Sequence, residues 1–583
     1  MFPMPPCAPM IPMNPDRKTC CSPLSPAECP PCAFFQSTSC NPAHVHINPI
    51  RYFEELHEAL ENAPPYGTII LTQDVTASPV VPNYNWVPVA INDGVNIIGN
   101  GHKIGSESDP TKRLNAPLIG NGATAIKDIF VENLTIYANT DPSISPAYTA
   151  ALAQHLSNSQ IVCVKTFGTV ESNQDYTAGI VAFASGKTTF TNCENYANVT
   201  GMTYVGGICA GTQNNANPYV VFTNCVNHGT ITSNQAAAGN SFVGGIAGTV
   251  YYSKLEYCVN DTSVFGNAAH SAGIAAYANN TAIQCCTNMG SVTGTRDEMA
   301  GICSYLLSNS HVNNCVNHGS VRGVSGSDIG GIVSTISANS SIEDCVNFGN
   351  VSGPINHAGG IASHADGATI IKNNVNKGQI SCASMVGGII GVLNYSANTS
   401  RGYVTDNINE ASVTGTGADV GGIAGAMSSN GTIENNCVTR GVDVRGTNNI
   451  GGIVGLAGVT TSGAGLSIVR NNTFEGKSVY GSGTGVRRII GHYVPTATPL
   501  FTLMVEGNKA ALETELTGSN ASLTDSIDTV TPIPGTPENY AGVRVRPTDI
   551  DLGLNRFQGF TLLGGEDLCK GNCSPYPYPY LNY

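Results

Sequence analysis

Residues 313–331 read NNCVNHGSVRGVSGSDIGG, and close copies of this stretch recur from about residue 163 to about residue 490. The copies share a Cys-Val-Asn-x-Gly core, a following Val or Ile, and a glycine-rich link into Gly-Gly-Ile. Equivalent positions are mostly 28 to 34 residues apart. A fixed period in this range is typical of solenoid proteins, in which each repeat packs only on its neighbours.

Three positions of the repeat hold one residue type in nearly every copy. The first position is occupied by Cys193, Cys225, Cys258, Cys286, Cys315, Cys345, Asn374, Asn407 and Cys437. The second, two residues later, is occupied by Asn195, Asn227, Asn260, Asn288, Asn317, Asn347, Asn376 and Asn409. The third is occupied by Ile180, Ile208, Ile246, Ile274, Ile302, Ile332, Ile361, Ile389, Ile423 and Ile453. If the copies stack, we expect the isoleucines to fill the interior and the asparagines to form a side-chain amide ladder.

The residue types inside the period predict strands and not helices. The segments between glycines are three to six residues long and rich in Val, Ile, Thr and Tyr, whereas a helical solenoid needs stretches of about 10 or more residues with a 3.6-residue period. Gly and Asn recur where a corner would need positive φ. The sequence therefore predicts an all-β protein, a parallel β-helix with one coil per repeat.

The repeats resemble the GLUG-type motifs of right-handed β-helix surface proteins. The resemblance lies in VGGIAG at 243–248, VGGIIG at 386–391, VGGIAG at 420–425 and IGGIVG at 450–455. It covers roughly half of the chain and implies a right-handed helix that forms an elongated adhesive or structural shaft. It does not imply one particular chemistry.

Residues 48–162 are expected to form the N-terminal cap and the first coils, before the repeat shaft of residues 163–494. The segment 52–63, YFEELHEALENA, places its apolar residues on one helical face, and Pro64-Pro65 ends it. Strands are predicted at 67–75, 95–104 and 126–137. This order of helix, strand and Gly-Asn-Gly turn resembles the first coils of the pectate-lyase-like superfamily.

Composition excludes several classes of protein. Only 11% of residues are charged, against about 25% in ordinary domains. The formal net charge is −14 and no Lys/Arg run occurs, so nucleic acid is not an expected partner. No run of 18 apolar residues is present, so no membrane span is expected. The first residues, MFPMPPCAPMIPM, lack the features of a standard signal peptide, and an extracellular destination would then need another route of release.

Residues 1–47 form a Pro/Cys-rich arm that carries Cys7, Cys20, Cys21, Cys29, Cys32 and Cys40. Three interpretations remain open: disulfides within the arm or to neighbouring subunits, reduced thiols on an extended tail, and a zinc site that uses Cys29-x-x-Cys32. The Cys20-Cys21 pair and its position are similar to the N-terminal connectors of bacterial spore-appendage subunits. That resemblance implies covalent links between successive subunits.

The C-terminal part breaks the period. Residues 495–568 are more polar and contain several prolines, which indicates a cap or small module. Residues 569–583 carry Cys569, Cys573 and the Pro/Tyr tail SPYPYPYLNY. The two cysteines are further candidates for intersubunit disulfides. The tail is expected either to dock on a neighbouring subunit or to be a disordered end.

The cysteine column allows two structures: a disulfide ladder, or a stack of buried reduced thiols. Neighbouring coils bring Cα atoms within bonding distance. However, Asn replaces Cys at 374 and 407, which favours an inward position for a small residue that tolerates Cys.

No catalytic or metal site is predicted, and no cofactor is expected. Polysaccharide lyases and hydrolases of this fold gather carboxylates on neighbouring coils, but here the acids fall at different repeat positions. They are Glu194, Asp261, Asp297, Glu298, Asp328, Asp344, Asp366, Asp406, Glu434 and Asp443. Asp344, Asp406 and Glu434 are expected in one register beside the Cys/Asn column, but only the last two are in adjacent repeats. His228, His318, His357 and His364 form no HxH or HExxH pattern.

The sequence thus favours a structural subunit of an extracellular or particle-surface fibre or appendage on a cell, spore or virion. Copies of the chain are expected to join head to tail, with the cysteine-rich arm crosslinking them. A glycan-binding adhesin or virion spike is the alternative, with surface glycans as partners. A polysaccharide lyase or hydrolase is the third hypothesis.

Overall fold

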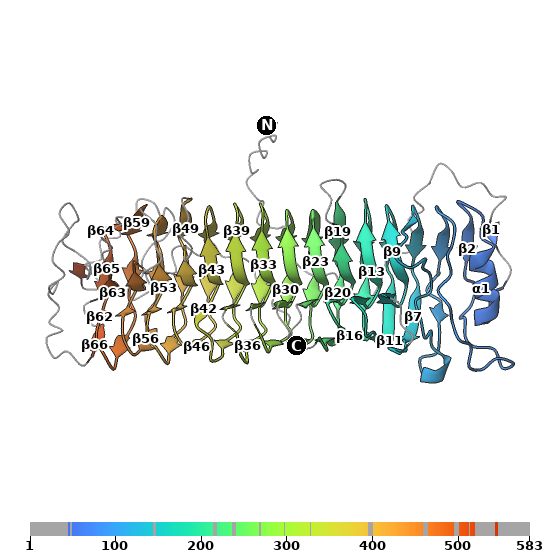
Figure 1. The fold of residues 1–583 in the computed structure, drawn as a ribbon, viewed down its shortest axis with the longest axis horizontal. Helices are drawn as coiled ribbons and strands as arrows, with labels where there is room; N and C mark the ends of the chain where they lie inside the picture. The colour runs from blue at the N-terminus through green and yellow to red at the C-terminus, as the bar shows by residue number, and fades with distance from the viewer. Residues whose placement is uncertain are drawn as a thin grey trace, which may run out of the picture.

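The computed structural model describes residues 45–46, 49–518 and 543–545, apart from gaps at 144–146, 214–218, 236–240, 268–269, 297, 327, 395–399, 459–464, 495–500 and 512–513. Within these residues the chain forms a parallel β-solenoid with a single α-helix (Figure 1). About 12 of its turns contribute a strand to every face. The prediction of an all-β parallel solenoid is confirmed.

One coil shows how the repeat folds. The coil that contains Cys315 is built from β34 (His311–Asn313), β35 (Val316–Asn317), β36 (Val321–Gly323), β37 (Asp328–Gly330) and β38 (Val333–Ser337). The next coil begins with β39 (Ser341–Glu343), which pairs in parallel with β34, so that Val312 lies beside Ile342. Each strand therefore pairs with its equivalent one coil away.

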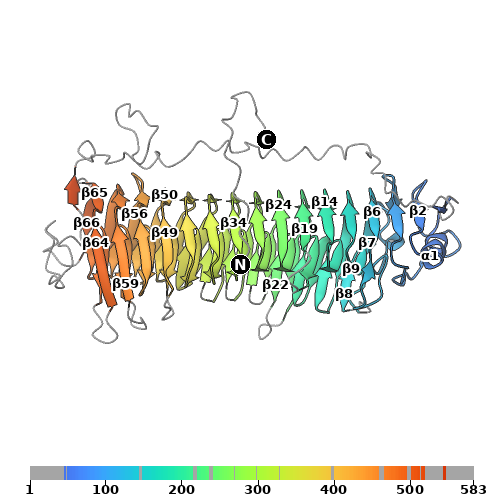
Figure 2. The same ribbon diagram turned by 90° about the horizontal axis from the view of Figure 1, so that it is seen from above.

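Four faces result from this stacking. A 16-stranded sheet runs from β1 (Val45–His46) to β64 (Phe501–Glu506), a 13-stranded sheet from β5 (Ile126–Lys127) to β63 (Ile490–Tyr493), and a 12-stranded sheet from β8 (Tyr148–Ala150) to β62 (Val486–Arg487). The remaining face begins with β4 (Lys103–Ile104), β7 (Thr135–Asn139) and β11 (Lys165–Glu171). From β15 (Glu194–Asn195) and β16 (Asn198–Gly201) onward it is split into two short strands per coil. At about 4.8 Å per strand, the 16-stranded sheet gives a shaft of about 70 Å. Figure 2 shows the strands of this sheet side by side along the long axis.

The corner after most strands of the 16-stranded sheet is a residue with positive φ. Asn192, Asn224, Asn314 and Asn373 occupy it with φ of 53°, 52°, 52° and 56°. Asn tolerates the left-handed region better than other residues that carry a side chain. The same corner holds Asp344 and Asp406, with φ of 57° and 59°, so these acids serve the turn. Glu434 lies elsewhere, because it pairs with Thr405 inside the sheet.

The interior is one continuous apolar cluster from Ile50 to Ala510. Every isoleucine of the predicted column is fully buried in it. Burial of a side chain of this size contributes about 1.5–3 kcal/mol. Since each Ile contacts its equivalents above and below, the stabilisation is spread along the whole shaft.

The asparagine column forms the expected amide ladder. Nδ2 of Asn317 donates to Oδ1 of Asn347 at 2.8 Å and to the carbonyl of Gly319 at 2.9 Å, while its Oδ1 accepts from Asn288 at 2.8 Å. The same links, each at 2.8 or 2.9 Å, join Asn195, Asn227, Asn260, Asn288, Asn317, Asn347, Asn376 and Asn409. Thr166 ends the ladder by donating to Asn195 at 2.7 Å.

The ladder interlocks with the Gly-Gly corner on the opposite wall of the coil. A Cβ atom on Gly301 would lie 2.2 Å from Cγ of Asn317 and 2.3 Å from the carbonyl oxygen of Gly331. Gly331 has the same relation to Asn347, with a Cβ only 2.4 Å from Nδ2. The Asn and Gly columns therefore depend on one another, because only glycine leaves room for the amide.

The N-terminal end is covered as predicted. Helix α1 (Phe53–Glu61) buries Phe53, Leu56 and Leu60 over the first coil, and Glu55 accepts hydrogen bonds from the backbone at its start (Figure 1). Trp86 packs edge-on against Phe53 at 6.0 Å.

The coils extend beyond the predicted boundary at residue 494. Strand β64 pairs over six residues with β59 (Gly465–Arg470). Strands β65 (Lys509–Ala511) and β66 (Glu515–Thr517) continue the split face, and β67 (Val543–Val545) pairs with β65. Residue 494 is therefore not the end of the solenoid.

We predict that Asn317→Ala lowers the free energy of unfolding by about 2–4 kcal/mol, since each buried polar group left without a partner costs about 1–3 kcal/mol. Asn288, Asn347 and Gly319 would each lose a partner. Urea unfolding followed by far-ultraviolet circular dichroism measures the change.

The control is Asn350→Ala. The exposed side chain of Asn350 accepts a hydrogen bond from the backbone N–H of Gln379. We expect this substitution to lower the free energy of unfolding by less than about 1 kcal/mol. Equal effects of the two substitutions would contradict a stabilising role for the ladder.

Candidate functional site

The candidate site lies on the outer surface where the 12-stranded and 13-stranded sheets adjoin. We call it the junction strip and define it by two columns of residues. The first column holds Tyr148, Tyr176, Tyr204, Phe242, His270, Glu298, Asp328 and His357. The second holds His155, Phe183, Tyr277, Tyr305, Thr335 and His364.

The repeat itself creates the strip. Each coil supplies one residue just before its Gly-Gly corner and another seven residues later, on the next sheet, as His357 and His364 do. The corner turns the chain so that the two side chains face the same outer angle. The rings of His357 and His364 are 6.1 Å apart.

The first half of the strip is aromatic. Tyr148, Tyr176, Tyr204 and Phe242 stack face to face with centroids 4.9, 4.5 and 5.5 Å apart. Phe183 packs edge-on against Tyr176 at 5.3 Å. Burial raises the pKa of Tyr176 and of Tyr204, so these phenols are neutral hydrogen-bonding groups at physiological pH.

The strip then changes from aromatic to ionisable residues. His270 stacks on Phe242 at 4.6 Å and forms an ion pair with Glu298 of the next coil. Tyr305 packs edge-on against His270 at 5.3 Å. Burial, together with the charges of Glu298 and Asp328, raises the pKa of Tyr305 to about 12.

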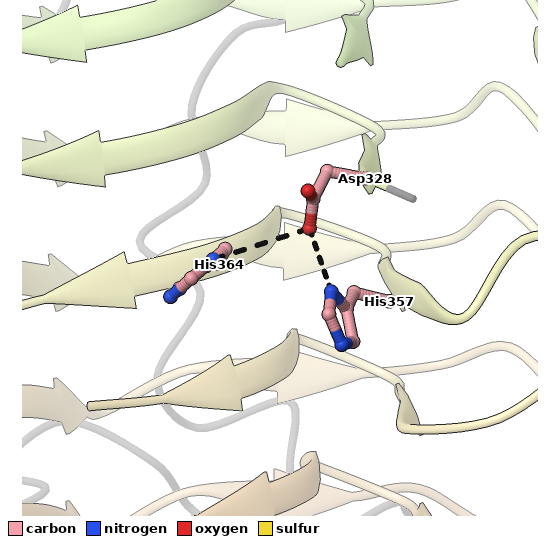
Figure 3. Close-up of side chains that lie close together, drawn as sticks. All are labelled: Asp328, His357 and His364. Carbon is pink, nitrogen blue, oxygen red and sulfur yellow. Dashed lines mark hydrogen bonds and ion pairs between the residues drawn. The ribbon is translucent and has the colours of Figure 1, made fainter. Parts of the chain in front are cut away.

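Asp328, His357 and His364 form the centre of the ionisable half (Figure 3). Asp328 begins β37, His357 begins β42 (His357–Gly359) of the next coil, and His364 lies in β43 (Ala362–Asp366). Oδ1 of Asp328 is 3.0 Å from Nδ1 of His357 and 4.0 Å from Nδ1 of His364. One ligand atom from each residue lies within 4.8 Å of the others, which is a spacing that a metal ion could bridge.

Two further polar residues hold this cluster in place. Oγ of Ser363 lies 3.0 Å from Oδ1 of Asp328 and 2.9 Å from the carbonyl oxygen of His357, and its single proton is shared between these two acceptors. Nε2 of His364 lies 3.2 Å from Oδ2 of Asp366. Burial lowers the pKa of His364, but the Asp366 contact and the charges of Asp366, Asp328 and Glu298 outweigh it, so that the net direction is upward.

Sequence reasoning missed this cluster because it searched for local motifs. The residues are brought together by the spacing of seven across a Gly-Gly-Ile corner and by the step of 29 residues between Asp328 and His357 in adjacent coils. Both spacings are present in the sequence. Assigning each polar residue to its column of the repeat would have revealed the cluster from these two spacings.

The six cysteines Cys193, Cys225, Cys258, Cys286, Cys315 and Cys345 lie in one buried column as unbridged thiols. The sulfur of Cys315 is 3.5 Å from the carbonyl oxygen of Ile283 in the preceding coil. Of the two predicted alternatives, the structure shows the thiol stack. The column then continues as a second amide ladder, in which Asn374, Asn407, Asn436, Asn472 and Asn508 are linked at 2.9 or 3.0 Å.

Cys437 corrects the predicted alignment. Asn436 occupies the column position, since its Oδ1 accepts from the backbone and side chain of Asn407 at 3.0 Å. Cys437 pairs instead with Ile408 and packs with Val375 in a small separate cluster. Matching Cys to Cys shifted the register by one residue, and a shift of one residue exchanges the two faces of a strand.

The other predicted crosslinking residues lie outside the described residues. They are Cys7, Cys20, Cys21, Cys29, Cys32, Cys40, Cys569 and Cys573. The structure therefore does not test the connector arm. Among the described residues, no helix is long and apolar enough to cross a membrane.

Comparisons with known proteins carry no argument about the fold or the function of this chain. No protein-family model matches the chain, and no curated protein matches it. A solved structure described as a putative immunoglobulin A1 protease from Bacteroides ovatus is similar, with 14% identity, a TM-score of 0.34, and coverage of 49% of this chain and 83% of that one. A similarity of this size carries no functional argument.

We predict that Cys315, in the buried cysteine column, does not react with iodoacetamide in the native protein, even at pH 9. Burial raises the pKa of the Cys315 thiol well above its ordinary value, and the thiolate is the reactive form. Peptide mass spectrometry should find Cys315 unmodified before denaturation and modified after it. Rapid labelling of Cys315 in the native state would contradict the buried stack.

Proposed function

We propose that the chain is a structural subunit that forms the rigid shaft of an extracellular or particle-surface fibre or appendage. The observation that carries this proposal is the unbroken register of the solenoid. A single apolar core extends through successive coils from Ile50 to Ala510. Two amide ladders together extend from Asn195 to Asn508. Such a shaft transmits force along its length, because each coil is bonded to the next on every face.

The N-terminal end of the shaft favours linkage through the N-terminal segment. Helix α1 covers the core of the first coil, with Leu56 and Leu60 fully buried beneath it. A second copy cannot stack directly on that capped core, so the cysteine-rich arm of residues 1–47 is the proposed connector. Head-to-tail contacts of this kind produce open filaments when the rotation between copies does not close. Disulfides at Cys20 and Cys21 would form in an oxidising exterior.

The composition and the GLUG-type resemblance also support a surface role. The chain is 11% charged and carries few positive residues, as expected for a shaft whose stability comes from stacked interior columns. The resemblance of VGGIAG at 243–248 to repeats of β-helix surface proteins also supports a surface role. The proposal assigns no catalytic activity to the chain.

A second candidate function is glycan binding along the shaft, and the aromatic half of the junction strip favours it. Tyr148, Tyr176 and Tyr204 present half-buried rings, with hydroxyl groups, at one-coil intervals on the outer surface. Aromatic rings combined with polar tips suit recognition of ligands that are partly apolar and partly polar. A regular row of such groups would suit an extended saccharide.

Negative-stain electron microscopy of the full chain, with and without reductant, tests the structural role. We expect rods joined end to end, with a ladder of oligomers on a non-reducing gel that reductant removes. Cys20→Ser/Cys21→Ser should shorten the oligomers, whereas Cys315→Ser, within the buried stack, should not. Isolated rods that are unaffected by reductant would contradict the fibre. Binding of these rods to a glycan array would then support the second candidate.

A further inference from the structure

The geometry points to a binding site for a divalent transition-metal ion of the zinc class, with Asp328, His357 and His364 as ligands. The three side chains come from three strands in two successive coils and converge on one point of the junction strip (Figure 3). Their ligand atoms lie within 4.8 Å of one another. This inference is independent of the fibre proposal, because it concerns the wall of the shaft and not its ends.

The donor set suits zinc-class ions better than calcium or magnesium. Two imidazole nitrogens and one carboxylate oxygen are typical ligands of Zn²⁺ and other first-row transition metals, whereas Ca²⁺ and Mg²⁺ prefer oxygen donors alone. Tetrahedral ligands at about 2.0–2.1 Å from zinc lie roughly 3.3 Å apart. The pair of Asp328 and His357 already lies at 3.0 Å. His364, at 4.0 Å from Asp328 and within 4.8 Å of the His357 ligand atom, needs to approach the other two ligands by at most about 1.5 Å.

The surrounding residues orient the ligands as metal sites require. Nε2 of His364 lies 3.2 Å from Oδ2 of Asp366 and Nδ1 lies 4.0 Å from Oδ1 of Asp328, so that Asp366 orients the ring with Nδ1 toward the cluster. Ser363 donates to Asp328 at 3.0 Å and fixes the carboxylate. A carboxylate behind a ligating histidine, and a hydroxyl on a ligating carboxylate, are the usual outer partners of such sites.

The burial of the cluster also favours binding. The side chains of Asp328, His357 and His364 are 11%, 17% and 17% exposed, so water competes poorly while one side remains open. Three protein ligands leave a fourth position for water or for a group of a partner molecule. Since Asp328 belongs to one coil and the histidines to the next, the ion would also join two coils.

The experiment uses the full chain, with its accessible thiols blocked by N-ethylmaleimide because the chain contains 20 cysteines. After treatment with a chelator, Zn²⁺ is titrated by isothermal calorimetry. The wild type is compared with Asp328→Asn, and with His364→Val, whose new side chain matches Val392 at the same position of the next coil. We expect the wild type to bind one more Zn²⁺ per chain than either variant, or to bind it about tenfold or more tightly.

The matched control is His155→Val. His155 lies in the same column of the same sheet, but its ring nitrogens contact the carbonyl of Ala123 at 2.8 Å and the hydroxyl of Ser185 at 3.0 Å. This variant should bind Zn²⁺ as the wild type does. Circular dichroism verifies the fold of each variant, and the thermal midpoint of the wild type should rise with Zn²⁺ more than that of His364→Val. Equal binding by the wild type and His364→Val, or no binding by the wild type, would overturn the site.

Discussion

The interlock of an asparagine amide with a glycine corner is the constraint on which the rest of the shaft depends. At Gly301 a side chain would collide with Asn317, and also with the backbone of the next coil. The close approach brings the Asn and Gly columns into contact, and the isoleucine column with other apolar side chains fills the rest of the interior. The same approach lets each amide reach its equivalent at 2.8 or 2.9 Å. Buried amides that are fully paired stabilise one register and penalise all others.

The outer surface is a consequence of this interior order. Because every coil has the same path, any outward position becomes a column, and residues far apart in sequence become neighbours at one-coil spacing. The junction strip is such a pair of columns. It changes from stacked tyrosines near Tyr176 to the histidine and carboxylate cluster at Asp328. A shaft of this kind can therefore carry binding sites along its wall without any change to its core.

Much of the fold could be predicted from sequence, because residues that recur at one position of a repeat pack on one another in the stack. The isoleucine column, the asparagine ladder and the capping helix at Phe53 follow from periodicity and residue type alone. The register at Cys437 could not be fixed by matching cysteines, since Asn436 is equally suited to the column. The Asp328 cluster required knowledge of which sheet each residue faces. A motif within one short segment does not show which sheet each residue faces.

Hydrogen–deuterium exchange, read by mass spectrometry on the wild type and on Asn317→Ala, tests most directly whether the ladder couples neighbouring coils. If the ladder couples neighbouring coils, backbone amides in the two flanking coils of the variant, at 283–294 and 342–353, lose protection, while the distant coil around Ile180 retains it. Unchanged protection in both flanking coils would show that the amide ladder is a result of stacking and not one of its causes.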